Sequence, residues 1–196
     1  MERVNAAGVR WQRFFIALVP PQVIQSEANA VRQVFADRFN SRKAFNSPPH
    51  VTLQPPFRWP LAEIDRLLQA VAVFADEQPP FSLQLQGFGA FPPRVIYIDV
   101  VKTPALERLQ ADLSNYLTEQ LSIQEKDPNR PFRPHMTVAF RDLTRSAFRQ
   151  AWPEFEQRPY QAEFTVDKLT LLIHNQQWVT HSEYPCGRAK AASGPS

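Results

Sequence analysis

Residues 49–53 read Pro-His-Val-Thr-Leu, and residues 134–138 read Pro-His-Met-Thr-Val. Both follow one pattern: proline, histidine, apolar, threonine, apolar. In an extended strand, successive side chains point to opposite faces. Each histidine would therefore share a face with its threonine, while the apolar residues on either side of the threonine would face a core. The pattern predicts two short strands, each with one polar face and one packed face.

The segments around the two motifs follow the same order of hydrophobic patterns. In the first half we predict strand 13–20, helix 22–39, strand 50–57 cut short by its prolines, helix 61–76 and strand 81–88. In the second half we predict strand 94–100, helix 104–121, strand 135–140, helix 145–156 and strands 164–173 and 178–184. Corresponding points recur after about 81 to 85 residues. An internal duplication is the simplest interpretation.

This order predicts an α+β fold: two pseudo-symmetric lobes, each with a mainly antiparallel sheet flanked by helices, around a central cleft. We expect a single bilobal domain over residues 13–186, with lobe 1 at about 13–92 and lobe 2 at about 93–186. Residues 1–12 and 187–196 are expected to be flexible tails. A parallel, doubly wound sheet is the alternative, but the chain has five glycines and lacks the glycine-rich turn typical of that fold.

The bulk composition is typical of a soluble globular protein. The chain has 196 residues, of which 43% are hydrophobic and 21% charged. It contains no apolar run long enough to span a membrane and no apolar segment typical of a secretory signal. Cys186 is the single cysteine, so no disulfide can form within the chain. We therefore expect a cytoplasmic protein, without membrane association or an obligate protein partner, that is a monomer.

Basic residues gather near the two motifs. The net charge is only +3, but the windows 35–65 and 120–150 together hold ten Lys or Arg and six Asp or Glu. Positive charge concentrated around one site favours an anionic ligand. Solvated loop charges that fall there by coincidence would give the same count, so the charge supports the motif but does not identify the ligand.

Two facing histidines suit displacement at phosphorus. A base must deprotonate the attacking hydroxyl or water, and an acid must protonate the departing oxygen. Histidine can do either near neutral pH, because its ordinary pKa is about 6.5. Threonine hydroxyls can donate hydrogen bonds to the non-bridging oxygens, where charge accumulates. The sequence thus predicts His50 and His135 as catalytic, assisted by Thr52 and Thr137, with no cofactor and no metal.

Each motif alone has a structural explanation. A core histidine bonded to a nearby threonine would produce the same residues, and short patterns recur by chance. The matched proline, the apolar neighbours and the equivalent repeat positions make that explanation weaker for the pair. His174 and His181 lack the threonine partner. A zinc site would call for thiolate or carboxylate partners, but only Cys186 offers a thiolate and no local cluster of His, Asp or Glu has ligand spacing. We reject a zinc site.

The segments HVTLQPPF (50–57) and RPHMTVAF (133–140) resemble the paired signatures of the two-histidine (2H) phosphoesterase superfamily, specifically its 2'-5' RNA ligase-like members. The resemblance covers about residues 13–185. It implies a bilobal α+β fold with a central cleft and metal-independent chemistry on 2',3'-cyclic phosphates, 2'-5' linkages or other nucleotide phosphodiesters. It also implies that His50 and His135 form the acid–base pair and that Thr52 and Thr137 bind phosphate.

Five further residues are candidates for binding the substrate. Arg133 shares the strand parity of His135, and an arginine there could bind phosphate in a bidentate manner, although an exposed loop arginine would fit the position equally well. Some RNA-processing members resemble each other in having an arginine five residues after the second histidine. This chain has Phe140 there and Arg141 next, which would face the same side as His135 unless a bulge intervenes. The remaining candidates are Arg58, Phe57 and Tyr97, the two aromatic residues as stacking partners for a base.

Two functions from different classes follow. The first is a metal-independent phosphodiesterase, or reversible 2'-5' RNA ligase, that acts on 2',3'-cyclic phosphate RNA ends or related nucleotides. The second is a non-catalytic module that binds RNA or a nucleotide in the same cleft. Two intact motifs favour the enzyme. The arginines near His135 would lower its pKa and favour it as the base, with His50 as the acid.

Overall fold

The computed structural model of the chain describes residues 3–4, 8–124, 127 and 130–187. Its strands are β1 (Arg3–Val4), β2 (Arg10–Leu18), β3 (Val51–Pro60), β4 (Phe81–Phe91), β5 (Val95–Val100), β6 (His135–Ala139), β7 (Gln161–Val166), β8 (Lys168–Asn175) and β9 (Gln177–Pro185). Its helices are α1 (Gln22–Phe39), α2 (Ile64–Asp76), α3 (Pro104–Leu121) and α4 (Arg145–Glu156), with short 3-10 turns η1 (Lys43–Asn46) and η2 (Leu61–Glu63).

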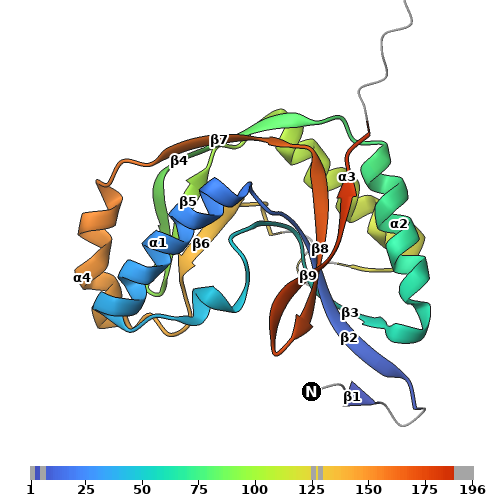
Figure 1. Cartoon of the computed structure of the whole chain (residues 1–196), viewed down its shortest axis with the longest axis horizontal. Helices are drawn as coiled ribbons and strands as arrows, with labels where there is room; N and C mark the ends of the chain where they lie inside the picture. Colours follow the sequence, from blue (N-terminus) through green and yellow to red (C-terminus); the bar gives the residue numbers. More distant parts are fainter. Residues whose placement is uncertain (1–2, 5–7, 125–126, 128–129, 188–196) are drawn as a thin grey trace, which may run out of the picture.

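The strands form two antiparallel sheets. The first, sheet A, has the order β3-β2-β8-β9, with β1 pairing beside the start of β2. The second, sheet B, has the order β6-β5-β4-β7. Helices α2 and α3 pack on the sheet A side, and α1 and α4 pack on the sheet B side (Figure 1). The predicted α+β class with two antiparallel, helix-flanked sheets is confirmed.

The lobes are not the two halves of the chain. Strand β4, in the first half, pairs with β5 and β7 in sheet B, whereas β8 and β9, in the second half, belong to sheet A. Helices α1 and α3 also cross to the opposite sheet, because α1 contacts β6 and α3 contacts β3. The boundary at about residue 92 was therefore wrong as a division between lobes. It falls in the tight β4–β5 turn, and that hairpin places both strands in one sheet.

The predicted strand 164–173 is two strands in different sheets. Strand β7 ends at Val166 and pairs with β4, and β8 begins at Lys168 and pairs with β2. Asp167, between them, is the point where the chain changes sheets. A continuous apolar pattern did not reveal this, because both strands bury their apolar side chains in the same core.

Strand β3 is longer than predicted because a bulge accommodates its prolines. Ile16 pairs with Gln54 and Phe14 with Phe57, so Pro55 and Pro56 lie opposite a single residue of β2. Proline lacks the N–H that a ladder needs, and a bulge on an edge strand is one place where that loss is tolerated. Strand β2 likewise begins at Arg10 rather than at 13 and pairs with β1, so residues 3–4 and 10–12 of the expected tail belong to sheet A. Most of the other expected tail, 188–196, lies outside the described residues.

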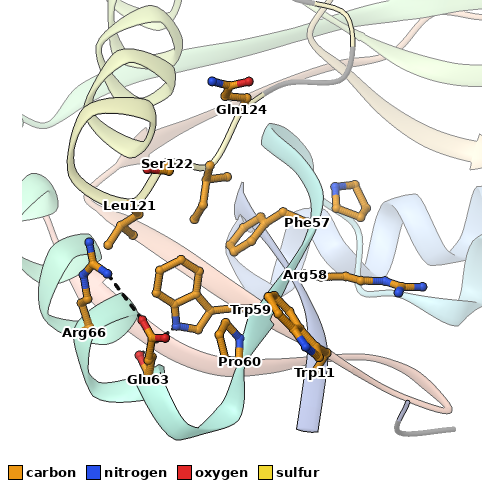
Figure 2. Close-up of a pocket in the computed structure, with 12 residues that line it drawn as sticks. Trp11, Phe57, Arg58, Trp59, Pro60, Glu63, Arg66, Leu121, Ser122 and Gln124 are labelled. Carbon is orange, nitrogen blue, oxygen red and sulfur yellow. Dashed lines mark hydrogen bonds and ion pairs between the residues drawn. The ribbon is translucent and has the colours of Figure 1, made fainter. Parts of the chain in front are cut away.

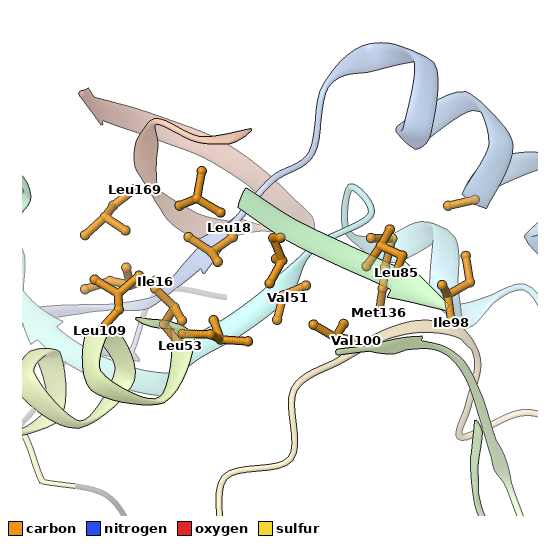
Figure 3. Packing of buried hydrophobic residues seen from close by; sticks show 14 of the residues in the cluster. Ile16, Leu18, Val51, Leu53, Leu85, Ile98, Val100, Leu109, Met136 and Leu169 are labelled. Carbon is orange, nitrogen blue, oxygen red and sulfur yellow. The ribbon is translucent and has the colours of Figure 1, made fainter. Parts of the chain in front are cut away.

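One hydrophobic core joins the lobes. Buried side chains from both sheets form a single cluster, in which Ile16, Leu18 and Val51 of sheet A meet Leu85, Ile98 and Met136 of sheet B (Figure 3). Burying each such aliphatic side chain contributes about 1.5–3 kcal/mol. The two motif-bearing strands, β3 and β6, are edge strands that contact each other across this junction. The shared core thus fixes where the motifs meet.

Candidate active site

The strand parity predicted for both motifs holds in the structure. Val51 and Leu53 on β3, and Met136 and Val138 on β6, are at most 2% exposed. The intervening histidines and threonines are only half-buried and lie on the other face. Thr52 is paired with Ala17 of β2, and Thr137 with Tyr97 of β5. Each sheet thus presents its motif in the same way, on an edge strand paired with one neighbour: β3 with β2 in sheet A, and β6 with β5 in sheet B.

The two histidines are held by equivalent hydrogen bonds. Nδ1 of His50 donates to the carbonyl oxygen of Pro48, and Nδ1 of His135 donates to the carbonyl oxygen of Arg133, both at 2.7 Å. A carbonyl can only accept, so Nδ1 carries the proton in both rings. In each neutral imidazole, Nε2 is then the basic nitrogen. The backbone two residues before each histidine therefore sets its tautomer and leaves Nε2 for chemistry.

Aromatic rings fix the orientation of each imidazole. The ring of Phe15 on β2 lies 4.8 Å from that of His50, measured between centroids. His135 is enclosed by Tyr97 at 5.2 Å and by Phe91 of β4 at 5.0 Å. A Cβ atom on Gly89, which is paired with Tyr97, would collide with the tyrosine ring. Glycine at that position lets Tyr97 lie flat across β4 and reach His135.

A buried arginine connects the two motifs. Arg32 of α1 is 2% exposed. Its Nη1 donates to the carbonyl oxygen of Ser47 (2.9 Å) and to Oδ1 of Asn29 (3.2 Å). Its Nη2 and Nε both donate to the carbonyl oxygen of Thr137, at 3.1 and 3.3 Å. One guanidinium therefore ties the loop before His50 to the strand that carries Thr137.

A cavity of about 220 Å³ lies where these elements meet. Its lining includes His50, Thr52 and Thr137, together with the basic side chains of Arg13, Arg32, Lys43 and Arg141. His135 does not line this cavity, but it is close enough for its charge to lower the pKa of His50. Within the part of the chain that the structure describes, no aspartate or glutamate lines this cavity. The cavity is therefore suited to an anion.

Both histidines have lowered pKa values. The pKa of His50 is lowered to about 4, mainly by burial; the bond to Pro48 opposes this shift, and the charges of Arg32 and His135 contribute to it. Burial also lowers the pKa of His135, aided by Arg130 and opposed by the bond to Arg133 and by Asp99. The expected reason for His135 to be the base was therefore wrong: burial outweighs the arginines, and Arg133 raises the pKa through its carbonyl. The choice of His50 as acid stays a prediction.

The structure places three of the five candidate substrate-binding residues near the motifs. Arg141 lines the cavity, because β6 carries a register shift and ends at Ala139, and Arg141 itself has a left-handed backbone with φ of 59°. Tyr97 contacts His135 as described. Arg133 lies before β6 begins, so strand parity does not apply to it; its side chain is exposed and its carbonyl holds His135.

The other two candidates, Arg58 and Phe57, lie outside this cavity. The bulge at the two prolines turns Phe57 toward Phe14, a core residue whose ring is 6.2 Å away, so Phe57 packs mainly in the core. Arg58 lies on the opposite side of β3. Both border a separate pocket between β3 and the end of α3 (Figure 2). Phe57 therefore does not line the cavity that holds His50, and its stacking on a base stays a prediction.

Several cavity residues were not singled out from the sequence. Arg32 is one residue of an ordinary amphipathic helix, and its burial depends on the crossing of α1 to sheet B. His174 and Trp178 come from the β8–β9 hairpin, which reaches the cavity from sheet A. His181 lies on the other face of that hairpin, against Phe14. The excess of basic residues at 35–65 and 120–150 was the one available signal, and it does include Lys43 and Arg141.

No group of three or more His, Cys, Asp or Glu side chains is placed to hold a metal ion within residues 3–4, 8–124, 127 and 130–187. No helix in that part of the chain has the length and apolarity needed to cross a membrane.

Known proteins share this sequence and fold. A protein of Bacillus cytotoxicus named "Putative phosphoesterase" is 28% identical over 178 residues, covering 88% of this chain and 96% of that protein. A Geobacillus kaustophilus protein of the same name is 29% identical over 179 residues, covering 89% and 96%. LigT of E. coli, solved with 3'-AMP, has a TM-score of 0.68 at 20% identity over 90% of this chain and 98% of LigT.

A second solved structure, TT0787 of Thermus thermophilus, has a TM-score of 0.66 at 20% identity, covering 90% of this chain and 98% of its own. At such identity the two structures show a common fold. The family itself is shown by sequence, because the model of the 2'-5' RNA ligase superfamily matches residues 20–178, which include both His-x-Thr motifs. This chain belongs to the 2'-5' RNA ligase superfamily of two-histidine phosphoesterases.

Proposed function

We propose that this chain is a phosphodiesterase that opens 2',3'-cyclic phosphates at RNA ends or in related nucleotides by two-histidine acid–base catalysis. The observation that carries this is the matched pair of imidazoles. Each is bonded through Nδ1 to the carbonyl oxygen two residues earlier, which leaves Nε2 as the reactive nitrogen. A pair of equivalent groups from two lobes can act on opposite sides of one phosphorus atom.

The reaction needs one imidazole as base and the other as acid. The Nε2 of the base takes a proton from water as the water oxygen forms a bond to phosphorus. The bond from phosphorus to one ribose oxygen breaks, and the Nε2–H of the acid gives its proton to that oxygen. The product is a phosphomonoester beside a free hydroxyl. With a ribose hydroxyl in place of water, the same steps would join two strands, which is the ligase direction.

The cavity residues suit the charge that develops on the phosphate. The hydroxyls of Thr52 and Thr137 can donate to the non-bridging oxygens, which gain charge in the transition state. Arg32, Lys43 and Arg141 add positive charge to the same cavity, and no acidic side chain stands among its described lining residues. The anion also stabilises an imidazolium, so binding of substrate would raise the lowered pKa of the histidine that serves as the acid.

A substrate screen with a chelator tests this function. We expect purified protein in excess EDTA to hydrolyse 2',3'-cyclic nucleotides and short RNAs that end in a cyclic phosphate. The chain's own residues supply acid, base and anion donors, so turnover is expected to survive chelation. Loss of turnover with EDTA and its return with added zinc or manganese would contradict the mechanism. Tight binding of the RNA without any turnover would instead support a non-catalytic binding module.

A further inference from the structure

The face of sheet A that carries Thr52 continues well beyond the catalytic cavity. On β2, alternation places Phe15, Arg13 and Trp11 on the same side as Ala17, which is paired with Thr52. Phe15 and Ala17 pack in a small cluster separate from the main core, which confirms that they share this face. Arg13 is four residues from Ala17, which in a strand is about 13 Å.

Two arginines face each other on this extension. Arg13 of β2 is directly paired with Arg58 of β3. Cβ atoms of directly opposite residues lie about 4.5–5.5 Å apart, and like charges at such positions destabilise a sheet. Both side chains are exposed, and neither forms an ion pair with any described residue. The guanidinium of Arg13 instead lies 5.1 Å from the ring centroid of Trp178. An anion between the two arginines would remove their repulsion.

A second cavity surrounds this pair and joins the catalytic one. It has a volume of about 650 Å³ and shares Arg13 and His174 with the catalytic cavity. Arg58 and Trp11 also line it, and none of the described residues in its lining is an aspartate or glutamate. The pocket of about 520 Å³ shown in Figure 2 shares Trp11 and Arg58 with this second cavity, and both side chains lie on its border. The three cavities therefore follow one another along β2 and β3.

We propose that Arg13, Arg58 and Trp11 form a second subsite that binds the nucleotides adjoining the terminal phosphate of a single-stranded polyribonucleotide, an inference that rests on the function proposed above. Guanidinium groups bind phosphate oxygens in bidentate geometry, and an indole ring offers a stacking surface to any base. Arg13 lines both cavities, whereas Arg58 and Trp11 line the second cavity but not the one that holds His50 and Thr52. The anion at Arg58 is therefore a different phosphate of the same strand.

The matched test compares long and short substrates. Arg58→Gln and Trp11→Ala are expected to lower kcat/KM for an oligoribonucleotide ending in 2',3'-cyclic phosphate by about tenfold, the scale of one lost stacking or phosphate contact. Neither change should alter kcat/KM for a 2',3'-cyclic mononucleotide. Arg149→Gln, an exposed arginine on α4 of the other lobe, is the control and should leave both substrates unaffected.

A binding measurement separates this subsite from the catalytic proposal. Fluorescence anisotropy with a labelled single-stranded oligoribonucleotide carrying a 3'-phosphate should show about tenfold weaker binding for Arg58→Gln than for the unaltered chain, and a shallower salt dependence. The same variant should melt no earlier than the unaltered chain, because it removes a repulsion; a purely structural arginine would lower the melting temperature.

The outcomes are distinguishable. Arg58-dependent binding without turnover of any cyclic phosphate would uphold the subsite and overturn the catalytic function. Turnover of both substrates, with Arg58→Gln lowering neither or lowering both equally, would uphold the catalytic function and overturn the subsite. An equal loss in Arg149→Gln would also overturn the subsite, because it would show a general effect of net charge.

Discussion

In the proposed reaction His50 and His135 take different roles, although the sequence around them is nearly the same. We expect His50→Ala and His135→Ala each to lower turnover of a cyclic phosphate by about 100-fold or more, the usual contribution of a general acid or base. A substrate with an activated leaving group needs little protonation, so it should restore turnover in the variant that lacks the acid and in that variant alone. Steady-state rates on both substrates check this.

The outcome of that comparison also assigns the roles. Rescue of His50→Ala would agree with the prediction that His50 is the acid, and rescue of His135→Ala would reverse it. Rescue of both variants or of neither would contradict a division into one acid and one base. Full activity of both variants would contradict the enzyme.

Burial of the two imidazoles predicts an unusual pH profile. The base must be neutral, so kcat/KM should fall as the pH drops through its pKa; the acid must be protonated, so kcat/KM should fall as the pH rises through its pKa. Both values lie below the ordinary 6.5 in the free protein, that of His50 at about 4. The maximum of kcat/KM should therefore lie below about pH 6.5, the ordinary pKa of histidine.

The profile of kcat reports the complex rather than the free protein. The bound anion favours the protonated imidazole, so the kcat maximum should lie at higher pH than the kcat/KM maximum. A kcat/KM profile centred above about pH 6.5 would show that burial does not control these groups. Measurements at constant ionic strength are required, because salt screens the neighbouring charges.

Helix α1 contributes to the site through Arg32. Its cation lowers the pKa of His50. Arg32→Met removes that charge, so the pKa of His50 should rise, as measured by NMR titration of the imidazole. It also leaves the carbonyls of Ser47 and Thr137 without their donor, which costs about 1–3 kcal/mol for each group left unsatisfied in a buried position.

Two further variants separate the effect of the Arg32 charge on the pKa of His50 from the effect of its hydrogen bonds. Arg32→Lys keeps the charge but not the fork of hydrogen bonds, so it should destabilise the fold while the pKa of His50 stays low. Arg38→Met, on the same helix, removes an exposed arginine that pairs with Glu154, and it should leave the pKa of His50 unchanged. An unchanged pKa in Arg32→Met would show that this arginine serves packing alone.

The exchange of elements between halves makes the whole molecule one folding unit. Residues 1–93 contain β4, whose partners β5 and β7 lie in the second half, while β2 needs β8 from the second half. We expect fragments 1–93 and 94–196, expressed separately, to be unfolded by circular dichroism and to regain structure when mixed. Two stably folded fragments would contradict the single shared core.

The packed and exposed faces of both motifs could be predicted from the sequence because they depend on local structure. Alternation along a strand depends only on the chain itself, so the pattern around His50 and His135 was enough to predict which side chains are packed and which are available. The four helices had the same advantage, because their apolar spacing and their ends are set by neighbouring residues; Thr103 and Thr144, for instance, cap α3 and α4. Charge near the motifs likewise followed from composition.

Only the tertiary structure decided which strands share a sheet and which residues meet in the cavity. The change of sheet at Asp167, the crossing of α1 and the bulge at Pro55 and Pro56 leave no periodic signal, because each depends on partners far along the chain. Arg32, Arg13 and Trp178 come together for that reason, and Phe57 turns away for the same reason. The sequence by itself determined which side chains the two motifs present, because alternation along a strand is local; long-range pairing determined the charged surroundings in which they lie.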